Sequence, residues 1–171
     1  MNRPNVLSLS AITALGFALL PGSALAQQKS LKEQLTGTWT LVSNDNTLPD
    51  GTKRQLFGAN PKGILILDAG GRYAQTQVRT DVPKFKSNNR LEATPEESKA
   101  AFVGSLAHFG TWAVNEADKT ITLHFEGSLN PNAMGGEEKR VVSSVTADEL
   151  KWTNQASNTG GKTETVYKRA K

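Results

Sequence analysis

The sequence predicts a mainly β protein: a closed antiparallel up-and-down barrel of eight or nine strands, with one α-helix near residues 95–108. Two patterns support this prediction. Short apolar or alternating segments, separated by turns of a few residues, run from about residue 37 to the C-terminus. Strands joined so closely pair with their chain neighbours in an antiparallel meander. Only one segment carries clear helix signals, whereas a parallel sheet needs a crossover connection between strands.

The first strands are identified from their hydrophobic patterns. Residues 38–42 alternate polar and apolar side chains, which is typical of a half-buried strand. A polar loop with Pro, Asp and Gly follows at residues 44–51. Residues 63–67 form a wholly apolar strand. Residues 73–79 return as its partner after a turn at residues 68–71, where glycine allows positive φ angles.

The predicted helix has a well-defined start after a loop at residues 81–93. Thr94 can cap the helix, and Glu97 three residues later completes a capping box. Pro95 suits the first helical position. We expect the helix to end near His108. One of its faces would carry Phe102, Val103 and Leu106.

The second half of the chain is all strand and turn. A polar, glycine-rich loop is expected at residues 154–162. Short turns at residues 116–118 and 147–149 join neighbouring strands. The expected strands are residues 109–115, 120–127, 139–146, 150–153 and 163–169.

The N-terminus has the pattern of a secretory signal peptide. An apolar run at residues 6–20 is followed by Pro21-Gly22 and by the cleavage pattern Ala24-Leu25-Ala26. The run is shorter than the ~20 apolar residues that a bilayer span needs, so we expect no stable membrane insertion. The prediction is cleavage after Ala26, a single barrel domain at residues 27–171, and a periplasmic or secreted protein.

Composition excludes several classes of site. The chain contains no cysteine, so neither a disulfide nor lipid attachment through an N-terminal Cys is available. It has no G-x-S-x-G or H-E-x-x-H motif, and two histidines are too few for a convincing metal site. We expect no metal and no cofactor.

The net charge is mildly positive, with 20 Lys and Arg against 16 Asp and Glu. The basic residues are consistent with a solvated surface or with attraction of anionic ligands. No aromatic residues interleave with them as stacking on bases requires, so nucleic acid is not an expected partner.

Several short motifs are spread over the chain. They are Leu35-Thr36-Gly37-Thr38-Trp39-Thr40-Leu41-Val42-Ser43, Asp81-Val82-Pro83-Lys84-Phe85, His108-Phe109-Gly110-Thr111-Trp112, His124-Phe125-Glu126-Gly127-Ser128-Leu129-Asn130-Pro131-Asn132 and Lys139-Arg140. Through these motifs the mature chain resembles the bacterial and fungal lipocalin-like domain proteins. The resemblance implies a small barrel of the type that usually holds a small molecule, and no common reaction.

The resemblance also implies how one end of the barrel is closed. In lipocalins the tryptophan of a G-x-W motif fills the barrel bottom, and a basic residue near the last strand packs over it. Gly37 and Trp39 match that motif here, and Arg169 or Lys168 would be the basic residue. Trp112 lies in a second G-x-W, and we expect it in the core or lining the pocket.

One departure from the family pattern concerns the barrel mouth. Proteins of this type often have a tryptophan just after the Pro-Asn pair, followed by a single glycine. Here the chain reads Ala133-Met134-Gly135-Gly136. We therefore expect a wider or more mobile mouth.

His124 is the residue best suited to acid–base chemistry or to recognition of a polar ligand group. By period 2, His124 and Glu126 share one face of a strand, and Leu123 and Phe125 share the other. The pattern alone leaves open which face is inward. The resemblance implies that His124, Glu126 and Arg140 form a polar cluster inside the barrel.

The leading functional hypothesis is an exported barrel that binds a small, partly apolar ligand. The expected ligand-binding residues are Tyr73, Trp112, His124, Glu126 and Arg140. One alternative is an isomerase, cyclase or hydratase in which His124 acts as acid or base with Glu126 or Tyr73. Another is a protein-interaction module that uses the outer wall. The ligand and the oligomeric state stay open.

Overall fold

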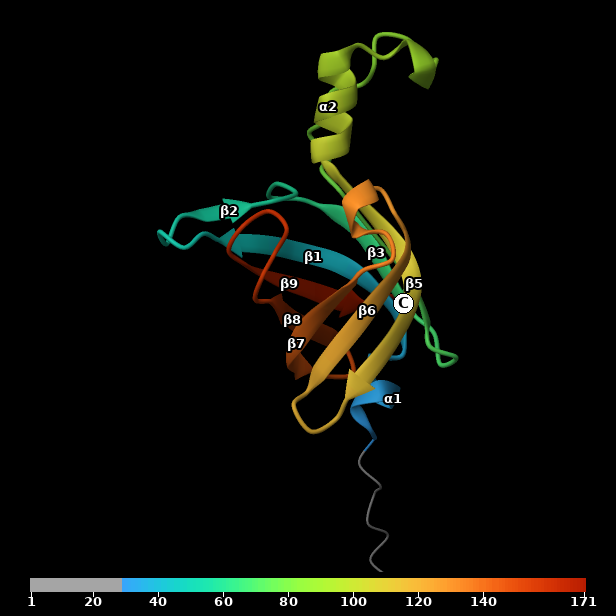
Figure 1. The fold of residues 1–171 in the computed structure, drawn as a ribbon, viewed down its shortest axis with the longest axis vertical. Coiled ribbons are helices and arrows are strands. Elements are labelled where there is room, and N and C mark those ends of the chain that lie inside the picture. The colour runs from blue at the N-terminus through green and yellow to red at the C-terminus, as the bar shows by residue number, and fades with distance from the viewer. Residues whose placement is uncertain (1–28) are drawn as a thin grey trace, which may run out of the picture.

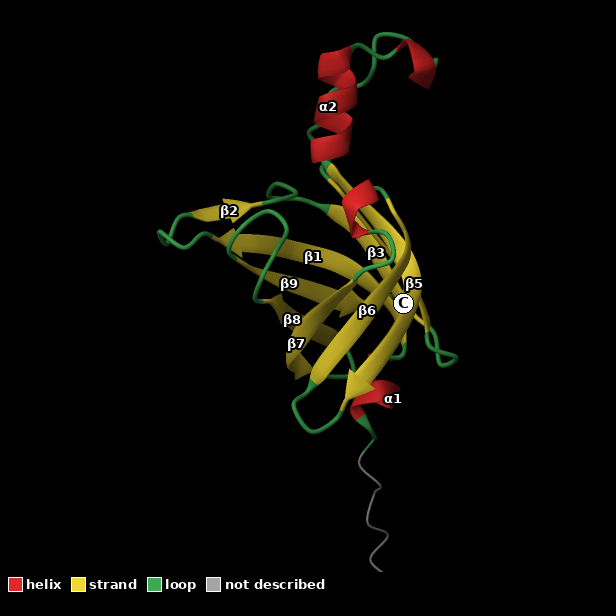
Figure 2. Ribbon diagram, in the orientation of Figure 1, coloured by secondary structure: helices red, strands yellow, loops and turns green. Residues whose placement is uncertain are grey.

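The computed structural model describes residues 29–171, which form a closed barrel of eight antiparallel strands and one extra strand (Figure 1; Figure 2). The predicted fold class is thereby confirmed, while the predicted signal peptide lies outside the described residues. The strands are β1 (Gly37–Thr47), β2 (Lys53–Gln55), β3 (Lys62–Leu67), β4 (Arg72–Val78), β5 (Ser105–Asn115), β6 (Thr120–Ser128), β7 (Glu137–Val145), β8 (Glu149–Asn154) and β9 (Lys162–Arg169). The helices are α1 (Leu31–Leu35), α2 (Pro95–Val103) and the 3-10 helices η1 (Arg90–Glu92) and η2 (Pro131–Ala133). Between residues 29 and 171, no helix has the length and apolar character needed to cross a membrane.

Pairing of the first and last strands closes the barrel. β1 pairs with β9 from Trp39 to Thr47, while its beginning also pairs with β3 and its end with β2. All other barrel strands pair with their chain neighbours, as a meander requires. β2 extends beside the far end of β1, beyond the barrel wall (Figure 1).

Side chains alternate between the interior and the surface along each strand. The apolar core fills the half of the barrel next to α1, and glycine-containing turns such as residues 68–71 close that end. The fully buried core side chains are Leu35, Trp39, Leu65, Leu67, Ile121, Leu123, Leu150, Trp152 and Tyr167.

A short helix that the sequence analysis missed covers this closed end. α1 begins with a capping box formed by Ser30 and Glu33, and it buries Leu31 and Leu35 against the core. The backbone N–H of Leu31 donates to the carboxylate of Glu116, 2.9 Å away in the turn between β5 and β6. A helix of five residues is too short for a periodic pattern to reveal it.

Trp39 is the central residue of the closed end. Its ring is fully buried, and its Nε1 donates to the carbonyl of Leu35 at 2.8 Å. The Arg169 guanidinium lies 3.9 Å from the centre of the Trp39 ring. The same guanidinium donates to the carbonyls of Thr36 and Gln34, at 3.0 and 2.8 Å. One side chain of β9 thus holds both the first strand and the helix before it.

Gly37 is required by this arrangement. Its φ angle is +134°, a conformation that residues with a side chain rarely adopt. A Cβ atom there would lie 2.7 Å from Nη1 of Arg169. Lys168, the other basic residue considered for this contact, is exposed.

The predicted helix is shorter than expected, and it contacts the barrel at β5 without being buried against it. α2 ends at Val103 rather than near His108, and β5 begins at Ser105. No residue of α2 is buried, and the helix projects from the open end of the barrel (Figure 1). The helical reading failed because Leu106 and His108 also fit a strand, and pairing with β4 takes them into the sheet.

Replacing Trp39 with Ala should lower the free energy of unfolding by about 3–5 kcal/mol, because a large buried ring leaves a cavity. Urea unfolding of the two proteins measures the difference. Leu91→Ala serves as a control, since the Leu91 side chain is 86% exposed. It should change stability by less than about 0.5 kcal/mol. A Trp39→Ala midpoint as close to wild type as that of the control would contradict closure of the barrel end by Trp39.

Candidate functional site

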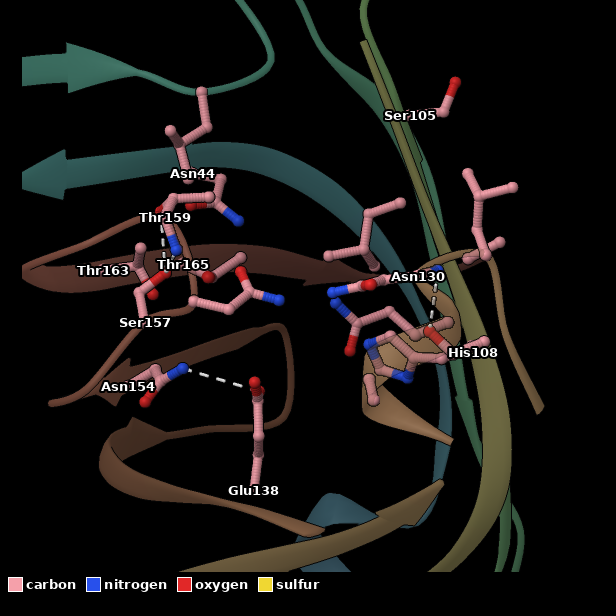
Figure 3. A pocket seen from close by; sticks show the side chains of 18 of the residues that line it. Asn44, Ser105, His108, Asn130, Glu138, Asn154, Ser157, Thr159, Thr163 and Thr165 are labelled. Carbon is pink, nitrogen blue, oxygen red and sulfur yellow. Dashed lines mark hydrogen bonds between the residues drawn. The ribbon is translucent and has the colours of Figure 1, made fainter. Parts of the chain in front are cut away.

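A cavity of about 460 Å³ opens at the end of the barrel opposite α1. Its rim comes from the segments that follow β1, β4, β6 and β8, so the closed end and the open end use different loops. Apolar walls are provided by Phe57, Phe102, Leu106, Phe125, Leu129 and Trp152. Polar side chains also face it, including Gln75 and Arg140. Others are labelled in Figure 3: Asn44, His108, Glu138 and Asn154.

A chain of hydrogen bonds leads from the cavity wall into the core. Nδ2 of Asn44 donates to Oε1 of Gln77 at 2.8 Å, and Nε2 of Gln77 donates to the Tyr167 hydroxyl at 2.8 Å. All three side chains are buried. Burial raises the pKa of Tyr167, so its hydroxyl stays protonated. These hydrogen bonds fix the orientation of the Asn44 amide at the cavity surface.

Tyr73 and His108 form a second buried polar pair. The Tyr73 hydroxyl lies 3.0 Å from Nδ1 of His108, and the two rings meet edge to face. Burial, and then the nearby Arg140 charge, lower the pKa of His108 to about 4. Burial raises the pKa of Tyr73. Both groups are therefore neutral near neutral pH.

Arg140 is buried in the cavity wall with a carboxylate partner. Its Nη2 donates to the carboxylate of Glu138, and its Nη1 donates to the backbone carbonyl of Lys139 at 3.3 Å. Nδ2 of Asn154 donates to the same carboxylate at 3.4 Å (Figure 3). The cavity thus contains an ion pair whose charges offset each other. Within the described residues, no three His, Asp or Glu side chains gather as a metal site would require.

Two buried amide oxygens of cavity-lining residues lack hydrogen-bond partners among the described residues. They are Oδ1 of Asn44 and Oε1 of Gln75. The two residues are only 8% and 4% exposed. Buried acceptors without partners are rare in folded proteins, because they lose their hydrogen bonds to water without replacement.

The expected placement of His124 and Glu126 inside the barrel is wrong. Phe125 faces the cavity, and the two polar side chains lie on the outer wall. Nε2 of His124 is 3.2 Å from the Glu137 carboxylate, and Glu126 makes a bidentate ion pair with Arg72. Apolar burial of Phe125 and its alternate neighbours decides the orientation of this strand.

Arg140 points inward, unlike His124 and Glu126, and the strand register explains this difference in orientation. It lies opposite Ile121 across β6 and β7, whereas His124 lies opposite Glu137. Residues directly opposite each other point to the same side of the sheet. Arg140 therefore shares the inner face with Ile121 and Phe125, and not with His124.

Of the remaining expected ligand-binding residues, neither lines the cavity. Trp112 is core: it is 4% exposed, its Nε1 donates to the carbonyl of Asp68 at 3.0 Å, and Lys32 of α1 lies over its ring. Tyr73 lies behind His108 and positions that ring. Trp112 thus belongs to the core at the closed end, the first of the two positions that the sequence predicts for it.

Sequence reasoning missed most of the polar residues at the cavity, among them Asn44, Gln75, His108, Glu138 and Asn154. The sequence predicts a loop at Asn44, whereas β1 continues to Thr47. His108 was assigned to the end of a helix. The alternation of Tyr73, Gln75 and Gln77 along β4 was the available signal, since all three lie on one face.

Comparison with solved structures finds other small barrels. A lipocalin-like protein from Bacteroides uniformis is 12% identical, with a TM-score of 0.45, covering 80% of this chain and 99% of its own. A redesigned β-barrel is 14% identical, with a TM-score of 0.43 and coverages of 83% and 96%. A de novo designed fluorescence-activating β-barrel is 11% identical, with a TM-score of 0.42 and coverages of 84% and 100%. Likenesses of this strength say nothing about what the chain binds.

No curated protein matches the chain. The family model of the lipocalin-like domain, by contrast, matches residues 36–170. The match begins just before β1 and ends after β9, so it includes all the strands of the barrel together with Trp39 and Arg169. The chain therefore belongs to the lipocalin-like domain family.

Proposed function

We propose that this protein binds a small, partly apolar molecule in the cavity at the open end of the barrel. The observation that carries the proposal is the cavity of about 460 Å³, with aromatic and aliphatic walls and a few buried polar groups. Sites for small molecules have this size and composition. The packed closed end leaves access through the mouth near α2 and η2.

Binding is better supported than acid–base catalysis. His124, the acid or base of the catalytic alternative, lies on the outer wall and cannot reach a molecule in the cavity. His108 does reach the cavity, but its lowered pKa makes it a weak base at neutral pH. Burial keeps the partner Tyr73 protonated. These two groups are better suited to orienting a ligand by hydrogen bonds.

We also propose that the protein is exported, on the basis of the pattern at residues 1–26. N-terminal sequencing of the protein from the fraction outside the cytoplasm should begin at Gln27. Intact Met1 in a membrane fraction would contradict cleavage and favour an anchor. The result of this test does not depend on whether the cavity binds a molecule.

N-phenyl-1-naphthylamine, an uncharged dye that fluoresces in apolar surroundings, tests the cavity. Its emission should rise saturably with the wild-type protein. Ala133→Trp should slow association several-fold, because Ala133 lines the rim and an indole ring in place of its methyl group narrows the mouth.

Ala117→Trp is the matched control for this experiment. Ala117 is exposed in the turn between β5 and β6 at the closed end, so its replacement should leave the association rate unchanged. Absence of saturable binding to the wild type would contradict the proposed function. Equal rates in all three proteins would contradict entry through this mouth.

Stability should fall as the pH is lowered towards 5, because of His108. Burial lowers the folded-state pKa of His108 to about 4, from an ordinary value of 6.5. Between these values the unfolded chain takes up a proton that the folded protein excludes, which favours unfolding. The free energy of unfolding should fall by about 2 kcal/mol between roughly pH 7.5 and pH 5.

Urea unfolding at these two pH values, with His108→Gln as the reference protein, measures this effect. The variant keeps a polar side chain that cannot titrate. Its loss of unfolding free energy over the same pH range should therefore be smaller by about 2 kcal/mol. Equal losses in the two proteins would show that His108 is not held neutral by burial.

A further inference from the structure

We propose that the ligand carries uncharged hydroxyl groups along one edge and is apolar along the opposite edge. This inference rests on the proposed function and deepens it, because it names the chemistry that the same cavity selects. The observation behind it is that polar and apolar side chains line different sides of the cavity, and that the polar side has hydrogen-bonding atoms still open to a ligand.

One side of the cavity is polar and comes from the last three strands. Among the described residues from β7 to the C-terminus, Trp152 is the one apolar residue that lines the cavity, and it belongs to the packed core. Asn154 of β8 lies opposite Thr163 of β9 and donates to the Glu138 carboxylate of β7, so the three strands form one surface. This polar wall consists of Glu138, Arg140, Asn154, Thr163 and Thr165.

The facing side of the cavity is apolar. Its apolar wall consists of Phe102 of α2, Leu106 of β5, Phe125 of β6, and Leu129 just after β6. β5 and β9 face each other across the barrel, because β6, β7 and β8 separate them on one side and β1, β3 and β4 on the other. His108, a polar neighbour on this side, is held by Tyr73 and packs its ring against Phe125.

The Glu138 carboxylate offers an acceptor that a molecule in the cavity can reach. Its side chain is 22% exposed, and its carboxylate end points into the cavity (Figure 3). Arg140 and Asn154 both donate to Oε2, whereas Oε1 has no partner among the described residues. Oε1 is also not fully buried, in contrast to the unpartnered amide oxygens of Asn44 and Gln75.

Two hydroxyl groups lie on the same wall. Thr163 and Thr165 line the cavity from successive inward positions of β9 (Figure 3). Among the described residues neither hydroxyl has a hydrogen-bond partner, and neither is fully buried. A hydroxyl group both donates and accepts. Hydroxyls along one edge of a ligand can therefore donate to Glu138 and accept from the two threonines.

The charges of the polar wall favour uncharged groups. Glu138 is already paired with Arg140. An anionic ligand group would lie beside the Glu138 charge, and a cationic group would lie beside the Arg140 charge. Burial of an ion without a partner is strongly unfavourable. A hydroxyl placed against Phe125 and the rest of the apolar wall would lose its bonds to water without replacement. Hydroxyls are therefore favoured on one edge only.

Four naphthalenes that differ in their substituents test the proposal. 2,7-Dihydroxynaphthalene carries both hydroxyls towards one long edge, and the 2,6 isomer carries them towards opposite edges. 2-Naphthoate and 2-naphthylmethylamine present an anion and a cation on the same rings. Displacement of the naphthylamine dye at neutral pH, or calorimetry, gives the four affinities. The 2,7 isomer should bind roughly ten-fold more tightly than each of the others, because each of them buries a polar group without a suitable partner.

The double variant Thr163→Val/Thr165→Val assigns this preference to the polar wall. It keeps both branched side chains and removes their hydroxyls, so the preference for the 2,7 over the 2,6 isomer should fall several-fold. Thr40→Val/Thr76→Val is the matched control: both threonines are exposed on the outer wall, and their replacement should leave the preference unchanged. If the first variant does not fold, the order of affinities in the wild type still decides the proposal.

The outcomes separate this inference from the proposed function. Equal affinities for the two isomers, or tightest binding of the 2,6 isomer or of a charged probe, would overturn the hydroxylated edge and leave a binding cavity in place. An unchanged preference in Thr163→Val/Thr165→Val would overturn the assignment to the two threonines. Failure of the dye and of all four probes to bind would overturn the proposed function, and this inference with it.

Discussion

The stack of Arg169 on Trp39 is the interaction on which the rest of the barrel depends. The guanidinium of the last strand lies on the indole of the first, and it also binds the carbonyls of Gln34 and Thr36 between α1 and β1. Three separate parts of the chain are thereby fixed at one end. Because this end is packed with apolar side chains, the polar interior residues are confined to the other end, where the cavity lies.

The open half of the barrel is organised by hydrogen bonds between polar side chains, where the closed half is packed with apolar ones. Tyr73 holds His108, Gln77 holds Asn44, and Glu138 holds Arg140, so three of the buried polar groups at the cavity are oriented by a second one. Such networks are favourable only when their members are satisfied. Two amide oxygens, of Asn44 and Gln75, have no partner among the described residues. Preorganised groups of this kind reduce the cost of ordering on binding.

The strand order and the turns were predictable because both depend on local signals. Alternation along residues 38–42 and the glycines of residues 68–71 act within a few residues. The orientation of β6 was not predictable in this way, because it depends on which side chains its neighbours bury. His124 faces outward because Phe125 is buried, and Arg140 faces inward because β7 pairs with β6 in the register that places it opposite Ile121. Both facts are non-local. The position of His108 at the cavity was not predictable either, because the apolar spacing of its segment fits a helix and a strand equally.

The central claim is that the cavity holds a small molecule. Protein purified from its own source, examined by native mass spectrometry before unfolding and by analysis of the small molecules released afterwards, tests this claim most directly. The account predicts one small, partly apolar molecule per chain, released on unfolding. Folded protein that releases nothing above the solvent background, and that binds none of the neutral apolar probes, would contradict it.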